Sequence, residues 1–86
     1  MYMNDRWSVC HHELSKKSHH QRRELYLDFC KLHPKLTERV KNALYIVVVN
    51  LETQSLTAEM SGLPKQVINR VVRKFRNYYF NYLYFS

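Results

Sequence analysis

Glycine, proline and cysteine are scarce in this chain of 86 residues, which has one glycine, two prolines and two cysteines. This scarcity excludes collagen-like, linker-like and turn-rich all-β sequences, and two cysteines are too few for a disulfide scaffold. The longest apolar stretch without a charge spans residues 43–49, whereas a membrane helix needs about 20 such residues. The length suits one small domain and excludes an enzyme with a separate substrate domain.

Acidic residues are absent from the C-terminal third of the chain. Residues 60–86 carry five Lys or Arg and no Asp or Glu, a net charge of +5. Residues 1–59 carry nine basic and all seven acidic residues, a net charge of +2. A small domain with its positive charge concentrated at one end is typical of proteins that bind a polyanion or an anionic membrane surface. The first six residues lack the pattern of a secretory signal, so we expect reduced cysteines.

The apolar pattern predicts an all-α domain of about four helices over residues 18–86. Residues 1–17 lack a sustained apolar period and are expected to form a flexible, basic and histidine-rich arm, either disordered or loosely docked, which Trp7 is able to pin to the body. The cations at residues 16–17 and 22–23 suit an arm that follows a minor groove or phosphates. A solvated leader explains them equally well.

Local signals predict the first two helices. Ser18 begins the first with capping-box spacing, and Pro34 ends it. Thr37 caps the second helix, in which apolar positions recur from Val40 onward at helical spacing. The β-branched run at residues 46–49 would favour a strand in isolation, but the 3-4-3 spacing favours a helix.

The next two helices follow an expected loop at residues 50–54. Ser55 is expected to cap a short helix over residues 56–61, and Gly62 to end it in the left-handed conformation. Pro64 then opens a fourth helix, since its missing N–H has no cost in the first turn. This helix is expected to reach residue 76, and an aromatic tail follows it.

The junction between these two helices has the residues of a helix-turn-helix. Two helices that cross steeply around a tight turn need a small residue at the crossing, a glycine in the turn and an apolar residue directly after it. Ala58, Gly62 and Leu63 meet these demands, and Ile68 and Val71 then face inward from the second helix. The pattern therefore predicts a fold that contains a helix-turn-helix.

The outward positions of the second helix predict how it would contact double-stranded DNA. Gln66 and Asn69 can bond the N6/N7 edge of adenine, and Arg70 the O6/N7 edge of guanine. A helical hairpin with a merely solvated basic face is the alternative, and the combination of a full core pattern with base-reading residue types favours DNA. The expected phosphate contacts are Ser55, Thr57, Lys65, Arg73, Lys74 and Arg76.

Residues 54–73 resemble the helix-turn-helix of small bacterial transcription regulators, and are similar to KorA/TrfB-type plasmid repressors and PapB-type regulators of fimbrial adhesin operons. With the latter, Thr37-Glu-Arg-Val40 and the apolar helix after it follow the same order. The resemblance covers about half of the chain and does not reach residues 1–30. It implies an all-α fold, binding to promoter DNA as a dimer or higher oligomer, and no enzymatic activity. We expect a cytoplasmic, nucleoid-associated regulator that acts as a repressor or an activator.

No residue pattern indicates a metal, a cofactor, a small-molecule ligand or catalysis. Cys30 and His33 have usable zinc-ligand spacing, but the other candidates, residues 10–12, lie in the expected arm and form no second pair. A core or boundary thiol is the favoured interpretation of Cys30. The chain has no nucleophile with a base at a recognisable spacing and no phosphate-binding glycine loop.

The tail has six aromatic residues within residues 78–85. A homodimer interface is the favoured interpretation, ahead of packing on the monomer core and of stacking on single-stranded bases. A protein-interaction module that binds a polymerase subunit or a partner regulator is the alternative to a DNA-binding regulator. A nucleoid binder without sequence preference is a third possibility.

Overall fold

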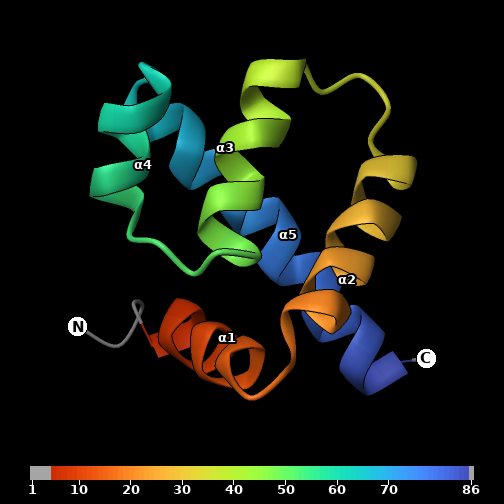
Figure 1. Cartoon of the computed structure of the whole chain (residues 1–86). Helices are drawn as coiled ribbons and strands as arrows, with labels where there is room; N and C mark the ends of the chain where they lie inside the picture. The colour runs from red at the N-terminus through yellow and green to blue at the C-terminus, as the bar shows by residue number, and fades with distance from the viewer. Residues whose placement is uncertain (1–4, 86) are drawn as a thin grey trace.

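The computed structural model describes residues 5–85, with side chains described for residues 9–81. Over these residues the chain is entirely helical and contains no strand, as the apolar pattern predicts (Figure 1). There are five helices in this range, one more than expected. They are α1 (Asp5–Ser15), α2 (His19–Leu32), α3 (Glu38–Val48), α4 (Gln54–Ser61) and α5 (Lys65–Phe85).

The additional helix lies where a flexible arm is expected. Cys10 and Leu14, one turn apart in α1, are fully buried, and α1 packs against α5. Two apolar side chains on one helical face are too few to form a sustained period in the sequence. Once α5 covers them, their burial is enough to stabilise the helix. Residues 5–15 therefore form a helix that packs on α5, at the place where the sequence predicts a flexible or loosely docked arm. The side chain of Trp7, expected to hold the arm, lies outside the described side chains.

Arg22 joins the C-terminal ends of two helices. Its Nε donates to the carbonyl oxygen of Val49, the residue that caps α3, at 2.8 Å. Its Nη1 donates to the carbonyl oxygens of Leu14 in α1 at 3.3 Å and of Lys17 at 2.5 Å. Helix C-termini leave carbonyls without intrahelical partners and carry partial negative charge, so one half-buried guanidinium stabilises both ends.

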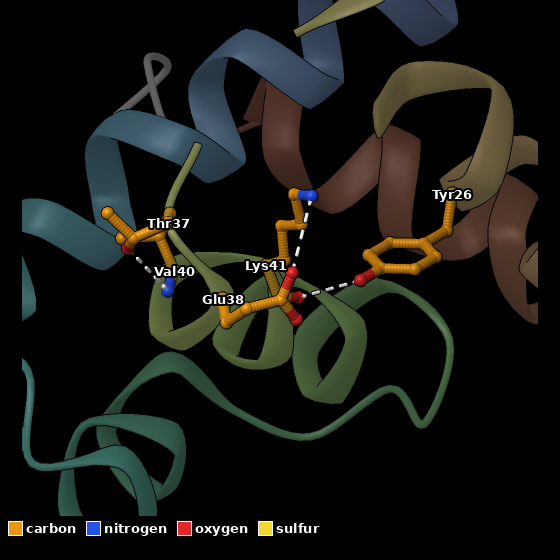
Figure 2. Close-up of polar contacts among 5 residues, drawn as sticks. All are labelled: Tyr26, Thr37, Glu38, Val40 and Lys41. Atoms are coloured by element: carbon orange, nitrogen blue, oxygen red, sulfur yellow. Dashed lines mark hydrogen bonds and ion pairs between the residues drawn. The ribbon is translucent and has the colours of Figure 1, made fainter. Parts of the chain in front are cut away.

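The N-termini of α2 and α3 are capped as the sequence predicts. Ser18 and Gln21 form the reciprocal capping box of α2. The Thr37 hydroxyl accepts from the backbone N–H of Val40 at 3.3 Å in α3. Figure 2 shows this cap beside the α2–α3 contact, where the Tyr26 hydroxyl donates to the carbonyl oxygen of Lys41 at 3.2 Å.

Helix α3 packs against α2, α4 and α5. Its β-branched end is helical, as the spacing predicts, and Val47, Val48 and Val49 are fully buried. The chain then turns through Leu51, a non-glycine residue at φ 62° whose side chain packs on the core. Left-handed backbone costs a residue with a Cβ about 1–2 kcal/mol, so core packing offsets this cost.

The last helix, α5, has 21 residues and continues past the point where a separate tail is expected. Its buried face holds Ile68, Val71, Val72, Phe75 and Tyr79, at successive spacings of three, one, three and four residues. Aromatic edges join it to α2, since the Phe29 ring lies 5.4 Å from that of Phe75. Within residues 5–85, no helix combines the length and apolar composition that crossing a bilayer requires.

Candidate nucleic-acid interface

The turn between α4 and α5 has the geometry that its sequence predicts. Gly62 adopts φ 73° and ψ 10°, and its N–H donates to the carbonyl oxygen of Ala58 at 3.0 Å. Ala58 and Leu63 are partly buried against the core, in which Ile68 and Val71 are buried. All five residues predicted for the core of the helix-turn-helix therefore lie at the junction between α4 and α5, which are joined by a short turn.

One face of α5 is exposed beside this turn. Its side chains line an open hollow of about 390 Å³. The lining residues are Lys65, Gln66, Asn69, Arg70 and Arg73. The structure thus brings the three predicted base contacts and two predicted phosphate contacts onto the same surface, which we call the α5 face.

A hydrogen-bonded row crosses this face. Asn69 Nδ2 donates to Oε1 of Gln54, the first residue of α4, at 3.4 Å. Arg73 donates to Asn69 Oδ1 at 3.3 Å. The Asn69 amide is therefore held from both sides, and each of its polar atoms keeps a second hydrogen-bonding position.

Gln54 is a site residue that the sequence analysis misses. It was assigned to the loop at residues 50–54, and Ser55 to the N-cap. In the structure Thr53 is the N-cap, because its hydroxyl accepts from the backbone N–H of Leu56 at 3.1 Å. Threonine is a preferred N-cap residue, as serine is, so Thr53 was a detectable candidate two residues before Ser55. Ser55 remains exposed in the first turn.

The other four predicted phosphate contacts, Ser55 among them, lie outside the α5 face. The Thr57 side chain is fully buried, and its hydroxyl donates to the carbonyl oxygen of Thr53 at 2.7 Å. Arg76 is half-buried, and its charge acts on the Cys10 thiol of α1. Neither side chain belongs to the α5 face, because α5 rotates Arg76 toward α1 and α4 turns Thr57 inward. Lys74 is exposed on a flank of α5.

The aromatic tail is partly core. Tyr79 is fully buried and its ring stacks on that of Phe75 at 6.5 Å. Tyr78 is half-buried and lies edge-on to Phe29 at 5.6 Å. Packing on the monomer core, ranked second in the sequence analysis, therefore accounts for this half of the tail. The side chains of residues 82–85 and the whole of residue 86 lie outside the described part of the chain.

Cysteine and histidine side chains do not gather into a site among the described residues. No group of three His, Cys, Asp or Glu side chains is placed to hold a metal ion within that part of the chain. Cys10 is buried, and burial raises the pKa of its thiol to about 12, although the Arg76 charge favours the thiolate. Such a thiol is a packing group and a poor nucleophile at neutral pH.

Comparison with known proteins finds no match. No protein-family model, no curated protein and no solved structure matches this chain. The functional argument therefore depends on the geometry and charge of the α5 face.

Proposed function

We propose that the chain is a sequence-specific, DNA-binding transcription regulator in which α4, the Gly62 turn and α5 form a helix-turn-helix. The α5 face carries this proposal. It presents amide and guanidinium groups on one exposed helical surface, and no acidic residue follows Glu59 in the chain. A helix with such a surface fits the major groove of B-DNA, whose phosphates attract the surrounding Lys and Arg.

Each residue of the α5 face, and Lys74 on the flank of α5, has a proposed role. Gln66, Asn69 and Arg70 contact base edges, the amides on adenine and the guanidinium on guanine. Lys65, Arg73 and Lys74 contact phosphates and set the position of the helix in the groove. The first turn of α4, which includes the exposed Ser55, contacts the phosphate backbone of the DNA through its backbone N–H groups.

The held amide of Asn69 supports base reading. A free asparagine samples several rotamers, whereas Asn69 has a partner on each side at 3.4 and 3.3 Å. Holding the amide before binding lowers the conformational entropy lost when it meets a base. We accordingly assign Gln54 the role of positioning Asn69. The resemblance to bacterial regulators supports a cytoplasmic, nucleoid-associated homodimer that acts on promoter or operator DNA.

Selection of duplexes from a random pool tests the proposal. Asn69→Ala and Arg70→Ala should each weaken binding to the selected sequence by about 1–3 kcal/mol and change binding to random DNA little. Lys74→Ala is the matched control, because it should weaken both duplexes alike and lower the salt slope by about one. Failure to bind any duplex, or an unchanged ratio of specific to random affinity in both reading variants, contradicts the proposal.

The outer side of α4 favours one alternative, a module that regulates transcription through a protein contact. Leu56 and Met60, one turn apart, are 39% and 60% exposed. Exposed apolar side chains on one helical face are typical of contacts with other proteins. Binding through them should persist as salt is raised, whereas DNA binding through several phosphates should weaken steeply.

A further inference from the structure

One exposed face of α2 has a pattern that the proposed function does not use. Glu24, Leu27, Asp28 and Lys31 follow one another at spacings of three, one and three residues, so they form a single stripe along the helix. All four are exposed, and the buried residues of α2 lie on its other side. We call these four residues the α2 stripe.

Among the residues whose side chains the structure describes, the charges of the α2 stripe form no ion pair. The ion pairs formed among the described residues are Lys16–Glu13 and Lys41–Glu38, and neither includes a member of the stripe. Glu24 and Lys31 are seven residues apart, about 10 Å along a helix, too far for an ion pair with each other. The stripe therefore begins with an acid, Glu24, and ends with a base, Lys31, and its second acid, Asp28, lies at its centre.

This order of charges is complementary to itself in the antiparallel direction. When two copies of α2 cross antiparallel about a two-fold axis between residues 27 and 28, Glu24 of each copy lies opposite Lys31 of the other. Leu27 of each copy then lies beside the axis, opposite Asp28 of the other copy, so the attraction comes from the two outer Glu24–Lys31 pairs. A two-fold interface requires a surface that matches its own rotated copy, and each ion pair forms twice.

Net charge also directs a second copy to this face. Each chain has a formal charge of +7, so two copies repel each other most strongly through their basic surfaces. The α2 stripe holds two of the seven acids and one base, a net charge of −1. Association through α2 thus brings together surfaces on which positive charge is low.

Space for a second copy exists beside the stripe. A hollow of about 380 Å³ is lined by the four stripe residues together with Cys30, Pro34 and Lys41. Figure 1 shows α2 on the opposite side of α3 from α4, so a copy docked on α2 leaves α4 and the turn accessible.

We propose that the α2 stripe is the interface through which two copies of this chain form an antiparallel, two-fold homodimer. This proposal names the interface of the homodimer given under the proposed function. Only the role of that dimer in DNA binding rests on the proposed function. Self-association is measured without DNA, so either proposal can fail alone.

Charge reversal tests the interface by sedimentation equilibrium at submillimolar protein. Glu24→Lys and Lys31→Glu should each raise the dimer Kd at least about tenfold, because each replaces two attractive pairs by two repulsive ones. The double variant should return to within about threefold of the original, since the pairs are restored in reverse. An equimolar mixture of the two single variants should form heterodimers. Glu59→Lys and Lys16→Glu make the same charge changes elsewhere and should leave the dimer Kd nearly unchanged.

Two results would overturn the proposal. One is a chain that remains monomeric throughout the concentration range. The other is a dimer that both single reversals leave intact, which would move the interface to another surface, such as the C-terminal end of α5. Circular dichroism of each variant confirms that the exposed substitutions leave the helices folded. Binding of the same preparations to selected DNA reports separately on the proposed function.

Discussion

Replacing Arg22 by alanine should destabilise the fold more than any other substitution of an exposed or half-buried charge. Its guanidinium donates three hydrogen bonds, to the carbonyl oxygens of Val49, Leu14 and Lys17. A hydrogen bond to a charged group contributes about 1.5–3 kcal/mol. Two of the three share one nitrogen, and water reaches part of the site. We therefore expect a total loss of about 3 kcal/mol rather than the sum.

That loss is measurable by urea and thermal unfolding. For a domain of this size, 3 kcal/mol corresponds to a fall in Tm of roughly 12–24 °C. Arg22→Lys keeps the charge but cannot donate from two fixed nitrogens, so it should lie between the original and the alanine variant. Arg23→Ala is the matched control, because Arg23 is exposed and its loss should change the free energy of unfolding by less than about 0.5 kcal/mol. Equal effects of Arg22→Ala and Arg23→Ala would refute the assigned role.

Three further predictions concern the turn, the buried thiol and the positioned amide. Gly62→Val should lower the free energy of unfolding by about 1–2 kcal/mol and Gly62→Asn by less, because φ is 73° and a Cβ there meets no atom within 4 Å, so the cost is conformational; equal stability would refute this. Folding raises the pKa of the Cys10 thiol from 9.0 to about 12. The stabilisation that the neutral, buried thiol provides is therefore complete below pH 9 and is lost as pH rises toward 12. Over this range the free energy of unfolding should fall by at most about 1.4 kcal/mol per pH unit because of this group. In Cys10→Ala, the free energy of unfolding measured in urea should fall less steeply between pH 9 and 12. An unchanged pH dependence would contradict the raised pKa of this thiol. Gln54→Ala should reduce discrimination at the base pair that Asn69→Ala affects while leaving affinity for random DNA unchanged, measured by competition between duplexes; full retention of discrimination would exclude the positioning role.

Local signals in the sequence determine much of the fold. The capping box at Ser18, the cap at Thr37 and the left-handed Gly62 all lie where predicted, because each depends on residues within one helical turn. The buried stripe of α5 is also predictable, since a 3-4 repeat of apolar residues is preserved over its length. The exposed positions of Gln66, Asn69 and Arg70 follow from that repeat.

Other features depend on which helices meet. Thr57 is polar and sits in a short helix, and only the packing of α4 on α3 and α5 encloses it. The helical repeat alone would allow Arg76 to face DNA as a phosphate contact. The packing of α1 on α5 instead places its charge near the Cys10 thiol. Gln54 reaches Asn69 across 15 positions of sequence, a distance at which spacing carries no information.

The sequence by itself determined that the chain is all-α, where α2 and α3 begin, and that one side of α5 is exposed, basic and rich in amides. The tertiary structure alone decided that residues 5–15 form a helix, that Tyr79 is core, and that Leu51 takes a left-handed backbone. The physical reason is the range of the interactions. Caps and helical periods act within a few residues, whereas burial requires a second surface, and the residues that supply it are distant in the chain.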